Sequence, residues 1–381
     1  MAAVNRLKKL FDFYVSDLNY EEFDRLIKRE VPEVYDFYVR RMKRPDLRHN
    51  PLRRALYFIW YLIVEFLERL TPLRRLFYSV AVFFFFWGNI TVQWNYAFLG
   101  FFMLNLMLAF EVADKLTARD ELAVARDIQT SLMPAEPPKS KYYDIASYYE
   151  TAKEVGGDYL DFLQLDNSEE GRLYVIVGDI SGKGMGAALR MVQVQAVLKY
   201  LICSCHTPRS ILIELNKNIR QILRPDNFFT VTVAALDCDG QIHLSRAGHP
   251  PMFHYVAQKK AVIPVTPAGM GIGLKDNGMF DKVIDQVTIT AAEDDVFVLF
   301  TDGVIETMNE RKDLFGEEKL KSILIKYADQ PAARIKEHIL ASLTYFRGSD
   351  IPEDDLSFVV LKAKRQGKVT SDDQNMSVQS K

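Results

Sequence analysis

The chain has 381 residues, more than one average domain, so we expect two domains or one domain with a long appendage. Its 49% apolar and 26% charged residues are typical of a protein with a hydrophobic core and exclude a wholly disordered chain. The net charge of −2 argues against general nucleic-acid binding, although ten Lys and Arg and only three acids lie between Arg40 and Arg75.

The three cysteines, Cys203, Cys205 and Cys238, do not form a disulfide framework and indicate a reducing compartment. Cys203-Ser-Cys205-His206 resembles part of a metal cluster, but it ends an apolar helical run and has no second cluster to complete it. We interpret these cysteines as small packing residues.

Residues 1–75 are predicted to form a helical cytoplasmic region, with short helices over 4–14 and 20–28 and a buried or interfacial helix over 55–67. Residues 76–110 consist of two uncharged 17-residue runs, Leu76–Val92 and Trp94–Phe110. With the basic cluster before them, they predict a two-span transmembrane hairpin with both flanks in the cytoplasm. The alternative is a pair of core helices in a soluble sensor domain.

Residues 111–135 are predicted to be a linker helix that ends before Pro134. One apolar stripe recurs along it at steps of three or four residues, made of Ala118, Leu122, Ala125, Ile128 and Leu132. Two interpretations remain open. The helix packs on its own domain, or it pairs with a second copy as a coiled coil and makes a homodimer.

Residues 136–364 change to short apolar strands, turns and paired helices, which favours an α+β domain over a repeating βαβ sheet. Strands are predicted over 145–149, 159–165, 173–177, 228–237, 241–246, 283–290, 295–301 and 356–364, and helices over 186–202, 207–223, 317–327 and 332–346. Residues 365–381 are predicted to be a disordered tail.

The segment Val175–Gly186 places Asp179 at the end of a buried strand and follows it with a glycine-rich turn. It is not a P-loop, because Gly178 and Gly182 enclose three residues instead of four and Lys183 precedes a glycine instead of a hydroxyl residue. An acid at a strand end beside a flexible turn is typical of a site for a hard cation.

Further acids repeat this pattern. Asp158 follows Gly156-Gly157, Asp302 follows an apolar strand and precedes Gly303, and Asp354 and Asp355 directly precede the last strand. A turn or N-cap aspartate explains any one of them, but several carboxylates at one sheet edge would repel one another unless cations lay between them. Oxygen ligands favour two Mn²⁺ or Mg²⁺ ions, which can clamp a displacement at phosphorus.

Together these motifs resemble those of bacterial PP2C-like serine phosphatases of the sigma-factor-regulator and stage II sporulation type. The resemblance covers about residues 118–363. It rests on six motifs in order: Ala125–Pro134, Val155–Tyr159, Val177–Ala188, Ala247–Pro251, Phe300–Glu306 and Asp354–Ser357. The family fold that it implies is an αββα sandwich.

The resemblance also implies roles. Asp179 would bridge both metals, Asp302 and Asp354 would complete one site, and Asp158 and the Ile180 carbonyl would serve the other, with Asp179 and Asp302 as the catalytic pair. It further implies a substrate, a phosphoserine or phosphothreonine on a small anti-anti-sigma-like protein, and a linker helix that dimerises and switches the enzyme.

The chain departs from the wider family in lacking an evident arginine to grip the substrate phosphate, as does this bacterial branch. His249 in Gly-His-Pro-Pro is a candidate general acid, but we expect it to fix a loop by hydrogen bonding. Two alternative functions remain: an inactive phosphatase-like binding module, and a two-metal phosphohydrolase for small molecules.

Overall fold

The computed structural model describes residues 60, 63–68, 70–153, 155–164, 171–182, 184–205, 207–220, 227–274, 278–348 and 352–364. The short helices predicted over 4–14 and 20–28, most of the helix over 55–67 and the predicted tail 365–381 lie outside these residues. The chain divides into two compact units, Met1–Leu116 and Thr117–Lys381, and each is described by itself.

In the first unit, helices α5 (Pro72–Ile90) and α6 (from Trp94) form an antiparallel pair joined by a tight turn. Small residues bring them together: a Cβ on Gly88 would lie 2.2 Å from the backbone nitrogen of Ala97, and one on Gly100 would lie 2.6 Å from the Ala81 carbonyl. At the other end, Arg74 forms an ion pair with Glu111 at 2.9 Å. The two helices predicted between residues 76 and 110 are therefore present as helices.

By length and composition, α6 is the one described helix that could cross a membrane. The predicted two-span membrane hairpin is thus not shown, although the helical hairpin is. Helix α6 continues without a break to Leu132, so the apolar run from Trp94 and the predicted linker helix are one 39-residue helix.

The second unit contains two five-stranded antiparallel sheets. One has the order β1-β10-β9-β6-β7 and the other β2-β3-β4-β5-β8. The strands are β1 (Tyr143–Glu150), β2 (Asp158–Gln164), β3 (Leu173–Ile180), β4 (Phe229–Leu236), β5 (Gln241–Ala247), β6 (Met252–Val256), β7 (Ala261–Val265), β8 (Gln286–Thr290), β9 (Val296–Phe300) and β10 (Leu356–Ala363). The helices after α6 are α7 (Met185–Ser204), α8 (Pro208–Ile219), α9 (Phe280–Val283), α10 (Asp302–Glu306), α11 (Gly316–Tyr327) and α12 (Ala332–Arg347).

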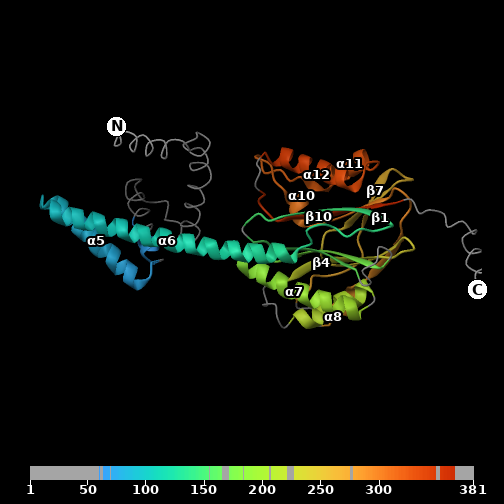
Figure 1. Ribbon diagram of the computed structural model, residues 1–381, viewed down its shortest axis with the longest axis horizontal. Helices are drawn as coiled ribbons and strands as arrows, with labels where there is room; N and C mark the ends of the chain where they lie inside the picture. The colour runs from blue at the N-terminus through green and yellow to red at the C-terminus, as the bar shows by residue number, and fades with distance from the viewer. Residues whose placement is uncertain are drawn as a thin grey trace, which may run out of the picture. The chain divides into compact units, whose positions relative to one another are not determined.

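Three apolar cores separate four layers, and Figure 1 shows the helices on the two outer sides of the sheets. Helices α7 and α8 pack on the β2–β8 sheet through residues such as Met191 and Ile211. Helices α11 and α12 pack on the β1–β10 sheet, and the third core, with Val177 and Phe297, lies between the sheets. This αββα arrangement confirms the predicted α+β sandwich.

Local sequence explains several element boundaries. Helix α8 begins at a capping box, in which Thr207 and Ser210 exchange side-chain and backbone hydrogen bonds, with Pro208 in the first turn. The β4–β5 hairpin closes on Gly240, whose φ of 81° lies in the left-handed region.

Some predicted boundaries are wrong. Residues 280–283 form the short helix α9, so the strand predicted from Val283 begins only at Gln286. Strands β6 and β7 were not predicted, because both are short and β7 contains Pro264. Helix α8 ends at Ile219, and the rest of its predicted range, from residue 221, lies outside the described residues.

Candidate functional site

Asp158 and Asp179 face each other on neighbouring strands, because β2 and β3 pair antiparallel with these residues in register. Asp158 is the first residue of β2 and is 2% exposed, and Asp179 is the next-to-last residue of β3. Burial raises the pKa of the Asp158 carboxyl well above its ordinary value, and the negative charge of Asp179 raises it further. Such a carboxylate pair is a place where a cation would be stabilised.

The backbone of Gly157 lies against the second half of this pair. The Ile180 N–H donates to the Gly157 carbonyl at 3.2 Å. A Cβ built on Gly157 would lie 2.8 Å from the Ile180 carbonyl oxygen and 3.0 Å from Asp179 Oδ1. Two predicted ligand atoms, the Asp179 carboxylate and the Ile180 carbonyl, are therefore on the same side, next to a residue that must lack a side chain.

The other predicted acids come from the second sheet and reach the same edge. Asp302 follows β9 as the first residue of α10, and Asp354 lies two residues before β10. The Thr301 N–H donates to the Ser357 carbonyl at 2.9 Å, and a Cβ on Gly303 would lie 2.0 Å from the Asp355 carbonyl oxygen. The segments that carry Asp302 and Asp354 are thus in direct contact.

Asp355 has a different role from Asp354, which the sequence did not reveal. Its Oδ1 accepts from the Ala152 N–H at 2.9 Å and its Oδ2 from the Gly157 N–H at 2.6 Å. Burial raises the pKa of Asp355, and these backbone hydrogen bonds oppose the shift. Asp355 therefore holds the loop before Asp158, and Asp354 remains the predicted metal ligand of the two.

Gln129 at the end of α6 was also missed. Its side-chain amide pairs with both backbone groups of Gly156: Nε2 donates to the carbonyl at 2.8 Å, and Oε1 accepts from the N–H at 3.1 Å. Gln129 is 3% exposed. Gln129 lies within the motif Ala125–Pro134, as Asp355 lies within Asp354–Ser357, but neither motif says which neighbour the side chain contacts.

The donor set is made only of carboxylate and carbonyl oxygens, which suits Mg²⁺ or Mn²⁺ and does not suit zinc. Among the described residues, no three acidic, histidine or cysteine side chains converge closely enough to form a complete metal site. The structure therefore brings the predicted acids to one edge, with Asp158 and Asp179 facing each other, without enclosing an ion. Two such ions, when bound, lower the pKa of a water and stabilise charge at phosphorus.

His249 lies in the interior next to this edge, 1% exposed, with Nδ1 3.0 Å from the Thr230 hydroxyl. Burial and the charge of Arg246 lower its pKa to about 3, against an opposing effect of the Phe300 backbone. With this pKa the imidazole is neutral at neutral pH and lacks the second proton that a general acid would transfer. Its contacts agree with the loop-fixing interpretation.

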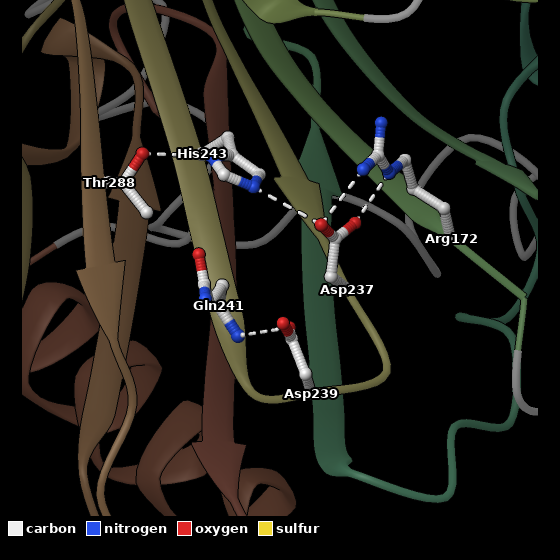
Figure 2. A network of polar contacts seen from close by, with 6 residues as sticks. All are labelled: Arg172, Asp237, Asp239, Gln241, His243 and Thr288. Atoms are coloured by element: carbon white, nitrogen blue, oxygen red, sulfur yellow. Dashed lines mark hydrogen bonds and ion pairs between the residues drawn. The ribbon is translucent and has the colours of Figure 1, made fainter.

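A polar network lies at the other end of strands β3 and β4 and has the acid, histidine and hydroxyl order of a catalytic triad (Figure 2). His243 lies between Thr288, at 2.8 Å from Nδ1, and Asp237, at 3.1 Å from Nε2. Arg172 also donates two hydrogen bonds to Asp237, one of them at 2.8 Å. Leu173 of β3 and Leu236 of β4 are paired here, far along both strands from Asp179 and its partner Thr230. Because Asp237 already has a guanidinium partner, we interpret this network as a clamp on strand ends.

Comparison with known proteins decides the family. Residues 169–364, just over half of the chain, match the family described as stage II sporulation protein E (SpoIIE). The chain belongs to the SpoIIE family. The SpoIIE match covers the strands and loops that carry Asp179, Asp302 and Asp354, and confirms the resemblance drawn from the sequence motifs.

Two curated relatives from Bacillus subtilis (strain 168) resemble this SpoIIE-family chain. Phosphoserine phosphatase RsbU is 26% identical over 250 residues, which cover 65% of this chain and 71% of RsbU. Phosphoserine phosphatase RsbP is 26% identical over 257 residues, which cover 66% of this chain and 59% of RsbP. The chain thus spans less than two thirds of RsbP.

Solved structures share the SpoIIE-type fold. The SiaA-PP2C domain of Pseudomonas aeruginosa aligns with a TM-score of 0.57 at 20% identity, covering 66% of this chain and 98% of that domain. The RsbU and RsbW domains of Rv1364c from Mycobacterium tuberculosis align with a TM-score of 0.53 at 24% identity, covering 62% and 64%. The second unit therefore has a PP2C-type fold, in agreement with the SpoIIE family match.

Proposed function

We propose that the chain is a metal-dependent protein phosphatase that removes phosphate from phosphoserine or phosphothreonine on a small anti-anti-sigma-like protein in bacterial signalling. The observation that carries the proposal is the buried Asp158 facing Asp179 at the edge where Asp302 and Asp354 also arrive. The names of the relatives RsbU and RsbP support phosphoserine as the substrate group.

In this proposal Asp179 would contribute to both of two Mn²⁺ or Mg²⁺ sites, Asp302 and Asp354 would complete one of them, and Asp158 and the Ile180 carbonyl would serve the other. The contribution of the neighbouring residues is to position these ligands. Gly157 allows the Ile180 carbonyl and the Asp179 carboxylate to approach the loop closely. Asp355 holds that loop from the second sheet through two backbone hydrogen bonds.

The test is phosphate release by the full chain in detergent micelles, with a phosphoserine-bearing anti-anti-sigma-like protein and a nucleotide as alternative substrates. We expect Mn²⁺-dependent release from the phosphoprotein, lost in Asp179→Asn and Asp302→Asn and kept in the matched control Asp239→Asn at the β4–β5 turn. Hydrolysis of the nucleotide alone would favour the small-molecule phosphohydrolase. Tight binding of the phosphoprotein without turnover would favour the inactive binding module.

We also propose that the first unit anchors the enzyme to the bacterial inner membrane as a two-span hairpin, with the phosphatase domain in the cytoplasm. Supporting this, large apolar side chains on α5 and α6 are widely exposed, among them Phe83 and Phe86 at 58% each, Trp94 at 62% and Phe98 at 67%. A lipid environment would remove this surface from water. Close packing through Gly88 and Gly100 is typical of paired membrane helices.

Finally, we propose that the end of α6 controls the site and pairs two chains in a homodimer. Gln129 contacts Gly156, two residues before Asp158. The neighbouring Ile128 is 55% exposed and Val124 is 59% exposed, which provides an outward apolar seam for a second copy. A change in this seam would reach the loop through Gln129.

A further inference from the structure

Two hydroxyl groups donate to one oxygen of Asp158. The Thr301 hydroxyl donates to Oδ2 at 2.8 Å, and the Ser357 hydroxyl donates to the same atom at 2.6 Å. Thr301 and Ser357 are fully buried and Asp158 is 2% exposed. The two donors come from one sheet and the acceptor from the other, so these hydrogen bonds cross the sandwich.

The direction of the Thr301 hydroxyl is fixed by a second contact. Its oxygen accepts from the Ser357 N–H at 3.1 Å, while the Thr301 N–H donates to the Ser357 carbonyl at 2.9 Å. The Ser357 carbonyl also lies 3.3 Å from the Thr301 hydroxyl oxygen, farther than Asp158 Oδ2 at 2.8 Å. The shorter contact therefore directs the hydroxyl proton to Asp158.

Each donor is covalently close to a predicted metal acid of its own sheet. Thr301 is joined directly to Asp302, and Ser357 follows Asp354 by three residues. The two hydroxyl groups therefore connect Asp158, in the sheet that contains β2, to the segments of the other sheet that carry Asp302 and Asp354. Because both donate to Oδ2, the remaining oxygen of Asp158, Oδ1, is the one available to a cation.

We propose that Thr301 and Ser357 are positioning residues of the metal centre, which fix Asp158 by one oxygen and set the distance between the acids of the two sheets. This inference rests on the proposed function, in which those acids bind Mn²⁺ or Mg²⁺. Hydrogen bonds to ligating carboxylates typically change metal affinity by about 10–100-fold when they are removed.

Two neutral hydroxyl groups do not neutralise the charge of a buried carboxylate that faces Asp179. Asp179 lies opposite Asp158 on the paired strand, so two carboxylates repel each other at this edge. A hydroxyl can orient the carboxylate but cannot balance this repulsion, whereas a divalent cation can. The pair is therefore suited to hold an acid in place for a metal.

The test measures Mn²⁺ binding directly, by calorimetric titration of the full chain in detergent, beside its Mn²⁺-dependent shift in Tm. We expect Thr301→Val and Ser357→Ala each to weaken Mn²⁺ binding about 10–100-fold. The matched controls are Thr232→Val and Ser245→Ala, which remove buried hydroxyls that have no hydrogen-bond partner among the described residues. Both controls should bind Mn²⁺ as the wild type does.

A second pair of variants keeps the test decisive if Thr301→Val folds poorly. Thr301→Ser and Thr301→Ala lose the same methyl group, and only the serine keeps the hydroxyl, so the serine variant should bind Mn²⁺ at least about tenfold more tightly than the alanine variant. In an Asp158→Asn background, Thr301→Ala should cause no further loss, because the carboxylate that it orients is gone. A general packing defect would instead add to the loss.

Mn²⁺ affinity within twofold of wild type in both Thr301→Ala and Ser357→Ala would overturn the positioning role while leaving the proposed phosphatase intact. Wild-type protein that binds no Mn²⁺ and releases no phosphate would overturn both. A further loss on adding Thr301→Ala to Asp158→Asn would assign the hydroxyl to packing alone.

Discussion

The carboxylate of Asp355 accepts a hydrogen bond of 2.6 Å from the backbone N–H of Gly157, although 198 positions separate the two residues. This bond holds Gly157 against the Asp179 carboxylate and the Ile180 carbonyl. A loop of the β2–β8 sheet is thereby fixed by an acid that precedes the last strand of the other sheet.

Gly157→Ala should therefore disable the site. The added Cβ would lie 2.8 Å from the Ile180 carbonyl oxygen and 3.0 Å from Asp179 Oδ1, so the loop or the ligands must move. A displacement of about 1 Å at reacting groups can cost about 100-fold in rate, and we expect at least that loss of Mn²⁺-dependent phosphatase activity. The matched control is Gly186→Ala in the first turn of α7, where the nearest atom is an Arg190 nitrogen at 3.7 Å. It should keep full activity. Equal activity of the two variants would contradict this account.

His249 should affect stability in acid and leave the neutral pH dependence of activity unchanged. Its pKa is about 3 in the folded chain, below the ordinary 6.5. As the pH falls from 6.5 toward 3, the unfolded chain takes up a proton that the folded chain does not, so stability is lost across that window. Tm measured from pH 7.5 to pH 4 should therefore fall less steeply in His249→Gln than in wild type. Identical slopes, or a limb of the activity profile between pH 6 and 9 that vanishes in the variant, would contradict this assignment.

Asp237→Asn should lower stability without affecting catalysis. The carboxylate receives two hydrogen bonds from Arg172 and a third contact from His243, and its side chain is 17% exposed. Charge-assisted bonds of this kind contribute about 1–3 kcal/mol, which lowers Tm by about 2–4 °C per kcal/mol in a domain of this size. Glu214→Gln, which breaks the exposed Lys217 pair, should change the free energy of unfolding by less than about 0.5 kcal/mol. An effect of Asp237→Asn on the Mn²⁺ dependence of activity would argue against a purely structural clamp.

Two kinds of substitution test the end of α6. Gln129→Leu removes both hydrogen bonds to Gly156 and should raise the Mn²⁺ concentration for half-maximal activity about tenfold, as expected when a contact that supports a metal site is lost.

Leu122→Asp and Ile128→Asp place a charge in the apolar stripe and should weaken dimerisation and change Mn²⁺ dependence together. Thr130→Asp, at an exposed position off the stripe, is the control. Light scattering beside a Mn²⁺ titration gives both readouts. A monomeric wild type whose stripe variants titrate identically would leave α6 as a passive connection.

The full chain should fractionate with membranes and resist carbonate and high-salt extraction, because a lipid bilayer would remove the exposed apolar side chains of α5 and α6 from water. A chain that begins at residue 118 should remain in the soluble fraction. Extraction of the full chain by salt alone would instead make these helices part of a soluble domain, the alternative that the sequence leaves open.

Local sequence was sufficient for the features that depend on neighbouring residues. The strands before Asp179 and Asp302 are continuous apolar runs, so the position of each acid at a strand end followed from the sequence. Strands β6 and β7 are five residues each, and the pairing of β6 with β9 and of β7 with β6 supplies stability that local propensity does not.

Contacts between the sheets could not be predicted in this way. Asp354 and Asp355 are adjacent and chemically identical, and only the contacts of Asp355 with Ala152 and Gly157 separate their roles. Thr301 and Ser357 are 56 positions apart and converge on one oxygen of Asp158 because β9 and β10 are paired. No pattern in the sequence gives that convergence.

Strand β10 is an interior strand of its sheet, between the edge strand β1 and β9, and pairs Ala363 with Tyr143. During synthesis on the ribosome, β10 emerges after every other described strand, and Asp354, Asp355 and Ser357 emerge with it. Until then, β1 lacks the strand with which it pairs, and the Gly157 N–H lacks the Asp355 carboxylate that accepts its hydrogen bond. Of the predicted metal-binding acids, Asp354 is still missing from the edge. The acids of the site therefore come together only after β10 has been synthesised and has joined its sheet.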